Sequence, residues 1–231
     1  MPIGTYFAAF HISMIEIEKP TVSDQQRERV RATYDGAQGA LLITASALSG
    51  NLASAEHLFK SRSFDLRGLR NILDVGSGGG QLTLPLLKYA EATAQVTCSD
   101  LSVNMLVRAK SRLRSKEPQF VSCDVEHLPF RCETFDGLTC GFVLEHLPDP
   151  HDGIAEMCRV LRRSGRMMLL IMVDGLLSSI TARMWHCHII DPRHLKDACE
   201  ALGLKLRTLI PLSGWQRVVR GPGLAMVFEK M

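Results

Sequence analysis

The chain has 231 residues, of which 46% are hydrophobic and 22% are charged, and its formal net charge is +3. This length suits one domain with an appendage, and the hydrophobic content is enough for a large core. So small a net charge does not indicate a nucleic-acid partner, and no apolar run reaches the roughly 18 residues of a membrane span.

The first third of the chain is helix-prone. Ser23-Asp24-Gln25-Gln26 resembles a capping box, and the apolar residues after it are spaced by three and four. The opening Met1–Ile15 is apolar but has neither a basic start nor a cleavage pattern, so we do not expect a signal peptide. We expect residues 1–62 to form an N-terminal helical cap and residues 63–231 to form the main domain.

Strand-like and helix-like segments alternate from Leu69 onward. The expected strands are Asn71–Val75, Gln95–Ser99, Gln119–Ser122, Gly137–Gly141, Met167–Val173, Leu204–Ile210 and Ala225–Glu229. The expected helices are Gln81–Tyr89, Val103–Ser115, His151–Leu161 and Pro192–Leu202. This alternation predicts an α/β fold: a Rossmann-like, doubly wound and mostly parallel seven-stranded sheet with helices on both faces. A ligand crevice is then expected at the carboxyl ends of the strands.

The stretch "ILDVGSGGGQL", residues 72–82, places four glycines within five positions after an apolar run. Because glycine costs conformational entropy, such a cluster indicates either positive φ angles or a close approach of another molecule to the main chain. A strand, a glycine turn and a helix N-terminus in this order form a ready site for a polar group of a ligand.

Acidic residues follow the first three expected strands or lie at their ends. Asp74 precedes the glycines, Asp100 ends the second strand about twenty residues further on, and Asp124 follows the third strand. A carboxylate in the place of Asp100 can accept hydrogen bonds from both hydroxyls of a ribose. Three acids beside a glycine turn suit a nucleoside ligand with little negative charge. A P-loop is excluded because no Gly-Lys-Ser/Thr follows, and a dinucleotide fingerprint meets Gln81 in place of its third glycine.

Cysteine usage and the histidine-rich segment bear on compartment and metal binding. The seven cysteines form no C-x-x-C pair, which predicts a reduced chain in the cytoplasm. Trp185-His-Cys-His188 lacks a second ligand pair at zinc spacing, so no metal is expected.

Five segments in order carry a family resemblance. Asp74–Gly80 is similar to the D-x-G-x-G-x-G signature of class I S-adenosylmethionine-dependent methyltransferases, and Asp100 matches the acidic end of their second strand. The other three matching segments are Cys123–Phe130, Phe135–Asp136 with Val143–Leu147, and Arg159–Arg166. The motif style is similar to the branch of the ubiquinone/menaquinone-biosynthesis and malonyl-carrier-protein methyltransferases. Within its R-V-L-K-P-G-G motif, Ser164 is expected at the proline position, with Gly165 as the one retained glycine.

This resemblance implies S-adenosyl-L-methionine as the cofactor and residues 63–231 as its binding domain. It implies that Asp74 faces the methionine amino group, Asp100 holds the ribose hydroxyls and Asp124 accepts from the adenine amine. Main chain around the glycine turn would lie against the cofactor, with Leu101 on the adenine. The implied cofactor-binding residues are Asp74, Gly76, Ser77, Gly78, Gly80, Asp100, Leu101, Asp124, Val125, Gly141 and Phe142.

The expected reaction is methyl transfer to a small-molecule or lipid-like acceptor, because the segments outside the match are mostly apolar. His146, after the fourth strand, is the first candidate for a general base, and His186 and His188 are weaker ones. Two alternatives stay open: a nicotinamide-dependent oxidoreductase and a non-catalytic nucleoside-binding relative. No nucleic-acid partner and no integral membrane segment are expected, and a homodimer is compatible with the sequence.

Overall fold

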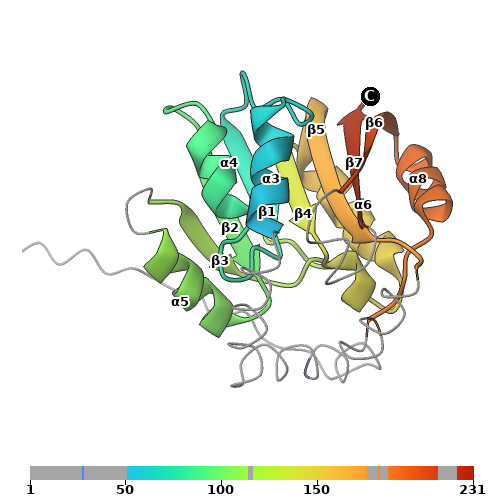
Figure 1. Cartoon of the computed structure of the whole chain (residues 1–231), viewed down its shortest axis with the longest axis horizontal. Coiled ribbons are helices and arrows are strands. Elements are labelled where there is room, and N and C mark those ends of the chain that lie inside the picture. Colours follow the sequence, from blue (N-terminus) through green and yellow to red (C-terminus); the bar gives the residue numbers. More distant parts are fainter. Residues whose placement is uncertain (1–27, 29–50, 114–116, 176–181, 183–186, 213–222) are drawn as a thin grey trace, which may run out of the picture.

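A seven-stranded sheet flanked by helices forms the centre of the molecule (Figure 1). The structure, a computed structural model, describes residues 28, 51–113, 117–175, 182, 187–212 and 223–231. Its strands are β1 (Asn71–Val75), β2 (Gln95–Asp100), β3 (Gln119–Ser122), β4 (Phe135–Gly141), β5 (Leu161–Met172), β6 (Leu204–Pro211) and β7 (Gly223–Lys230). The helices are α3 (Asn51–Lys60), α4 (Thr83–Tyr89), α5 (Val103–Arg112), α6 (Pro150–Val160) and α8 (Pro192–Ala201), with a 3-10 turn η1 (Leu144–His146).

The strand order across the sheet is β3-β2-β1-β4-β5-β7-β6. All neighbours from β3 to β5 pair in parallel, whereas β7 runs antiparallel to both β5 and β6. The expectation of a mostly parallel, doubly wound sheet is therefore confirmed. The chain moves outward from β1 to β3 and then returns to β4, so the order reverses between β1 and β4. We call the edge where β1 to β5 end the carboxyl edge and the opposite edge the amino edge.

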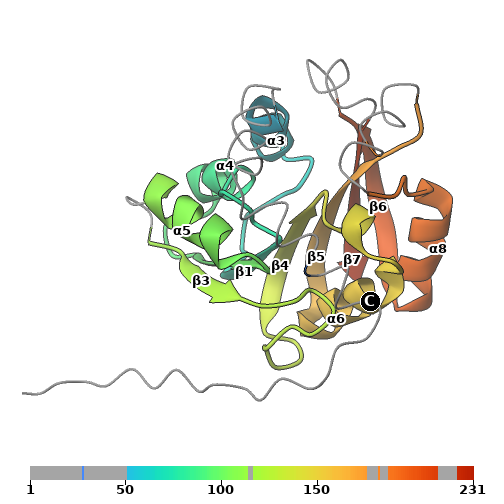
Figure 2. The same ribbon diagram turned by 90° about the horizontal axis from the view of Figure 1, so that it is seen from below.

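The long strand β5 shows how the sheet serves two cores. Met167, Leu169 and Ile171 belong to the cluster under α6 and α8, whereas Met168 and Leu170 belong to the cluster under α3 and α4. This alternation follows from the two-residue period of a strand. Figure 2 shows α3, α4 and α5 on one side of the sheet and α6 on the other.

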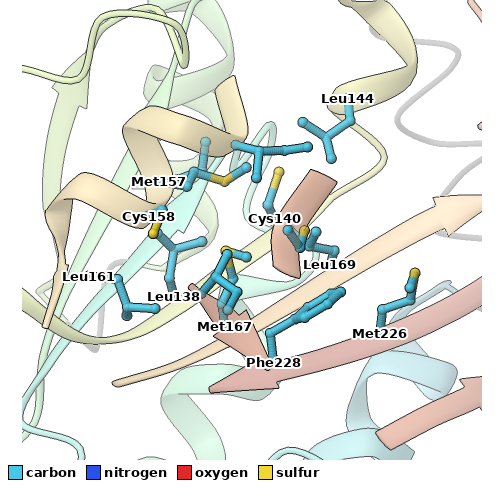
Figure 3. Close-up of a cluster of buried hydrophobic side chains, with 14 of the residues drawn as sticks. Leu138, Cys140, Leu144, Met157, Cys158, Leu161, Met167, Leu169, Met226 and Phe228 are labelled. Atoms are coloured by element: carbon cyan, nitrogen blue, oxygen red, sulfur yellow. The ribbon is translucent and has the colours of Figure 1, made fainter. Parts of the chain in front are cut away.

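The larger core cluster lies between the sheet and α6. Met157 of α6 packs with Leu138, Met167 and Phe228 from three different strands, and all four side chains are fully buried (Figure 3). Burying side chains of this size contributes roughly 1.5–3 kcal/mol each relative to leaving them exposed. This core fixes α6, and the segments bonded to α6, relative to the carboxyl edge.

Three helices begin with the capping chemistry that their sequences encode. The Ser102 hydroxyl accepts from the Met105 amide at 3.1 Å and starts α5. Asp149 and Asp191 cap α6 and α8, and each is followed by proline at the first helical position. These caps satisfy main-chain N–H groups that have no partner within the helix.

The start of β5 differs from its sequence prediction. The strand begins at Leu161 rather than Met167, because Leu161 pairs with Phe135 on β4. Ser164 has a φ of +59°, which proline cannot adopt. The expectation that Ser164 occupies the proline position of the motif is wrong: Arg163 takes that place, and Ser164 stands at the first glycine.

Of the expected cap, residues 1–62, the structure describes residue 28 and residues 51–62. Leu58 and Phe59 of α3 pack with Leu86 of α4 in the core on one face of the sheet. The rest of this segment lies outside the described residues, so its role as a cap stays a prediction. None of the helices in the described part of the chain has the length and apolar character needed to cross a bilayer.

None of the seven cysteines, all of which lie in the described part of the chain, forms a disulfide bond. Burial raises the pKa of Cys98, Cys123 and Cys199 to about 12, and it also raises the pKa of Cys140 and Cys158. Cys132, in contrast, is exposed on the segment between β3 and β4.

Candidate functional site

Asp74 lies inside the sheet just below the carboxyl edge. It is fourth in β1, in register with Cys98 on β2 and Thr139 on β4, and only 1% of its surface is exposed. Its Oδ2 accepts from the Thr83 hydroxyl at 2.5 Å and its Oδ1 from the Thr139 hydroxyl at 2.8 Å. Burial raises the pKa of Asp74 to about 6, although both hydroxyl bonds act in the opposite direction. Asp74 thus joins the start of α4 to β4 beneath the glycine turn.

The glycine turn after β1 has the left-handed conformation that its sequence predicted. Gly76, Gly78 and Gly80 have φ angles of +62°, +53° and +79°. A Cβ at Gly76 would lie 2.1 Å from Cγ2 of Val143, and a Cβ at Gly80 would lie 3.1 Å from Cδ1 of Leu113. At these two positions the missing side chain makes room for other side chains of the protein itself.

Gly78 is different. A Cβ there would meet, among the described residues, only the flexible end of Gln81, whose Oε1 lies 3.4 Å away. The Gly78 amide donates to Oδ2 of Asp100 at 2.8 Å, and the other oxygen of that carboxylate accepts from the Ser102 amide at 2.9 Å. The main chain at Gly78 is therefore open to close approach, directly beside the acid at the end of β2.

Ser77 and Leu101 flank this contact. The Ser77 side chain is buried, and its amide donates to the Ser99 carbonyl at 2.9 Å, which closes the turn onto β2. Leu101 follows Asp100 directly and is half-buried. The predicted residues from Asp74 to Leu101 are thus brought together at the ends of two neighbouring strands.

Asp124 is connected to the same edge through the main chain. The Cys123 amide donates to the Asp100 carbonyl at 3.1 Å, and Oδ1 of Asp124 accepts from the Glu126 amide at 3.0 Å. Asp124 is half-buried, whereas the Val125 side chain belongs to the core. Of Val125, only the main chain can therefore face a ligand at this edge.

The exit of β4 forms the other half of the site. Phe142 has a φ of +58°, and its amide donates to the Leu170 carbonyl at 2.8 Å. A Cβ at Gly141 would be in ordinary contact with Leu82, 3.4 Å away. Val143, next in the chain, covers Gly76, so the predicted residues Gly141 and Phe142 lie beside the glycine turn.

Glu145 is a residue of this exit that sequence reasoning missed. Its side chain is 2% exposed, and Oε1 accepts from the Met172 amide at 2.7 Å at the end of β5. Its carbonyl accepts from the His188 amide, also at 2.7 Å. The signal in the sequence was an acid inside the apolar stretch 143–147.

Two of the candidate general bases lie in or next to the 3-10 turn η1. His146 is half-buried, and its amide donates to the Val143 carbonyl at 2.9 Å. His188 is exposed, and the Glu145 contact brings its main chain next to that of His146. His186 lies outside the described residues. Within the described ranges, no three His, Cys, Asp or Glu side chains are grouped so that they could hold a metal ion.

The arrangement suits a neutral or cationic ligand with hydroxyl groups. Carboxylates at the end of β2 and after β3 can accept hydrogen bonds, the buried Asp74 lies beneath them, and the open main chain at Gly78 allows a flat approach. The site lies where the strand order reverses, which is where ligands bind in open α/β sheets.

Comparison with known proteins agrees with this geometry. Residues 73–169 match the methyltransferase domain family. The chain is 31% identical over 153 residues to the ubiquinone/menaquinone biosynthesis C-methyltransferase UbiE of Ectopseudomonas mendocina, covering 63% of this chain and 59% of that protein. It is 30% identical over 159 residues to UbiE of Pseudomonas fluorescens, covering 66% and 61%. The chain thus spans about three fifths of the length of these relatives.

Solved structures share the fold. Magnesium protoporphyrin IX methyltransferase (ChlM) from Synechocystis PCC 6803, with bound SAM, superimposes with a TM-score of 0.70 at 16% identity, over 89% of this chain and 97% of that one. Geranyl diphosphate methyltransferase in complex with GPP and sinefungin gives 0.64 at 17% identity, over 78% and 77%. These likenesses show the fold, whereas the family match and the UbiE relatives support the methyltransferase expectation and not the nicotinamide-dependent alternative. The resemblance read from the sequence is confirmed: residues 73–169 match the methyltransferase domain family, and the chain has a fold found in S-adenosylmethionine-dependent methyltransferases.

Proposed function

We propose that this protein binds S-adenosyl-L-methionine at the carboxyl edge of its sheet and transfers the methyl group to a small-molecule or lipid-like acceptor. The observation that carries the proposal is the open main chain at Gly78, bonded to Asp100 at 2.8 Å. Glycine is required there both by its φ of +53° and by the ligand that would lie against it. The matched methyltransferase domain, residues 73–169, contains this contact.

The residues of the edge would divide the work of holding the cofactor. Asp100 would accept from the ribose hydroxyls and Asp124 from the adenine amine, with Leu101 against the ring. The main chain of residues 76–78 would lie along the methionine part and the ribose, with Gly141 and Phe142 flanking the methionine end. Asp74 would contribute negative charge beneath the amino group while its own oxygens accept from Thr83 and Thr139.

The cofactor, when bound, supplies a methyl group already activated by its sulfonium centre. The chain then has to align the acceptor with that methyl, and holding reacting atoms about 3–3.5 Å apart can supply roughly 7–11 kcal/mol of the barrier. For an acceptor that carries a weakly acidic proton, His146 is the proposed general base. Its place on η1, the short turn that follows Val143 at Gly76, supports this role.

The acceptor class is supported by the relatives. UbiE is named for ubiquinone and menaquinone biosynthesis, and the structural neighbours are named for a porphyrin and for geranyl diphosphate. All of these names refer to small molecules that have a substantial apolar part. A cytoplasmic location and a homodimer remain predictions from the sequence.

Methyl transfer itself has to be measured, because the fold also occurs in the [4+2]-cyclase SpnF, at a TM-score of 0.60. The first test is calorimetric titration with S-adenosylhomocysteine and, in parallel, with NAD. We expect binding of S-adenosylhomocysteine alone; binding of NAD alone would overturn the proposal.

The second test incubates the protein with methyl-labelled S-adenosylmethionine and a panel of quinone precursors, acyl carriers and phenols. We expect label in at least one acceptor, and much less label with Asp100→Ala at a limiting cofactor concentration. Binding without transfer to any acceptor would instead favour a non-catalytic nucleoside-binding protein. Asp136→Ala, at the amino edge, is the matched control and should keep the activity.

A further inference from the structure

An ion pair on α6 holds the segment that follows β3, which we call the Asp124 loop (residues 123–131). Arg159 and Glu156 form a two-pronged pair, with Nε to Oε1 at 2.6 Å and Nη2 to Oε2 at 2.8 Å. Such charge-assisted, bidentate pairs have a well-defined geometry. The pair is partly shielded, since the side chains are 32% and 22% exposed.

The remaining hydrogen bonds of this pair go to the main chain of the loop. Arg159 donates through Nη2 to the Leu128 carbonyl at 2.9 Å and through Nη1 to the Phe130 carbonyl at 2.8 Å. Glu156 accepts from the Leu128 amide at 2.9 Å. Both main-chain groups of Leu128 are therefore held by one pair of side chains from α6.

Asp124 is close to this anchor and rigidly connected to it. The His127 amide donates to the Asp124 carbonyl at 3.1 Å, and the two residues form an isolated β-bridge. The Val125 and Leu128 side chains on either side are buried in the core under α6. A displacement of Leu128 therefore shifts Asp124, because the short turn between them is closed by its own hydrogen bonds.

The charges of the pair are stable at neutral pH. The hydrogen bond with Arg159 lowers the pKa of Glu156, and the same bond raises the pKa of Arg159. The helix α6 is packed on the sheet through the fully buried Ile154 and Met157. The Arg159–Glu156 pair therefore fixes the Asp124 loop relative to the sheet.

We propose that Arg159, together with Glu156, is a positioning residue for nucleobase selection: by fixing Leu128 it places the Asp124 carboxylate where the exocyclic amine of adenine is read. This inference rests on the proposed function, because it names how the cofactor's base would be recognised. Neither residue touches the cofactor; both act through the Asp124 loop.

The test compares two ligands that differ at the group Asp124 would read. S-adenosylhomocysteine has the exocyclic amine, whereas S-inosylhomocysteine has a carbonyl oxygen there. We expect the native protein to prefer the adenosyl compound by roughly tenfold or more, the value of one good hydrogen bond to a charged group. We expect Asp124→Ala and Arg159→Ala each to reduce this preference to near unity, with a much smaller change in the affinity for the inosyl compound.

The double variant separates positioning from independent effects. If Arg159 acts through Asp124, then Asp124→Ala combined with Arg159→Ala should show no further loss of preference. Arg207→Ala is the matched control. It removes another Arg–Glu pair, in which Nε of Arg207 on β6 donates to Oε2 of Glu229 on β7 at 2.9 Å. Within the described residues this pair has no contact with the Asp124 loop. Arg207→Ala should leave the preference intact.

A merely structural role for Arg159 would lower the melting temperature and leave the preference unchanged, and that result overturns the inference. Equal binding of both ligands to the native protein also overturns it. If Arg159→Ala does not fold, Arg159→Lys is the deciding variant. Lysine keeps the charge but cannot bond two carbonyls and Glu156 at the same time. A reduced preference for the adenosyl compound in this variant supports the inference, and an unchanged preference overturns it. Absence of binding of either ligand to the native protein would instead refute the proposed function.

Discussion

Carboxylates lie at both edges of the sheet, but with different partners. At the amino edge, Asp65 accepts from the Arg67 guanidinium at 2.6 Å, and this bond lowers the pKa of Asp65 to about 2. At the carboxyl edge, Asp74 is held by two threonine hydroxyls, and burial raises its pKa to about 6. Pairing with arginine favours the charged form of Asp65, whereas the charged form of Asp74 costs free energy. We interpret the amino edge as built for stability and the carboxyl edge as built for a ligand.

The largest effect is expected at the open main chain of the carboxyl edge. Gly78→Val places a branched side chain where the cofactor would approach, in a conformation with φ of +53°. We expect calorimetry to show the affinity for S-adenosylhomocysteine reduced by on the order of 100-fold or more, about 3 kcal/mol.

The control for Gly78→Val must carry the same backbone strain elsewhere. Gly203, with a φ of +82° and no described atom within 4 Å of an added Cβ, lies just before β6 at the amino edge. Gly203→Val should lower the melting temperature and leave the affinity unchanged. Equal loss of affinity in both variants would show that strain, and not the blocked approach, is responsible.

The second prediction uses pH to compare the edges. Because the folded-state pKa of Asp74 is raised from 3.8 to about 6, the folded protein binds more protons than the unfolded chain between these values, and stability falls as pH rises through them. The free energy of unfolding of the native protein, measured in urea, should therefore decrease relative to Asp74→Asn by roughly 2–3 kcal/mol between pH 4 and pH 7, at about 1.4 kcal/mol per pKa unit.

Asp65→Asn is the counterpart at the amino edge. The pKa of Asp65 is lowered to about 2, so its stabilising effect is present above the ordinary pKa and is lost only as pH falls toward 2. The difference in the free energy of unfolding between this variant and the native protein should stay nearly constant from pH 4 to pH 7. If the difference in the free energy of unfolding between Asp74→Asn and the native protein were also constant over this pH range, the two edges would not differ as we infer.

The third and smallest prediction compares an aspartate expected to affect ligand binding with one expected to affect stability. Asp100→Ala should weaken the binding of S-adenosylhomocysteine by roughly 1–3 kcal/mol, because it removes a charged acceptor from the ribose hydroxyls. Asp136, at the amino edge, accepts from the Arg70 and Asn71 amides, both at 2.9 Å, and Asp136→Ala should instead reduce the free energy of unfolding by a similar amount. Calorimetric titration and urea unfolding should be measured for both variants. Weaker ligand binding by Asp136→Ala would contradict the prediction.

Local patterns were sufficient to predict most of the fold. β1 and β3 have the predicted bounds, because apolar runs bordered by turn residues define short strands well. The left-handed glycines were expected from the glycine cluster, whereas the hydrogen bond from the Gly78 amide to Asp100 was not predicted. The early start of β5 did not, since Leu161–Arg166 is polar and joins the strand through its contact with Phe135.

The features missed in the site depend on contacts between distant residues. That Val143 covers Gly76, or that Thr83 and Thr139 bond Asp74, depends on strand register and helix placement. Arg159 lies 31 residues from Leu128, so its hydrogen bonds with the Asp124 loop could not be read from spacing. The sequence could indicate which residues carry the chemistry but not which residues hold them in place.

The exposed thiol of Cys132 has a practical consequence. It lies 3.7 Å from Nη1 of Arg159, whereas the raised pKa values of Cys98, Cys123 and Cys199 keep these thiols neutral. Because reaction requires an accessible thiolate, a maleimide fluorophore should label Cys132 ahead of these three. A dye at that position would lie beside Arg159, and a change in its emission during titration with S-adenosylhomocysteine would show whether the neighbouring chain moves when a nucleoside binds.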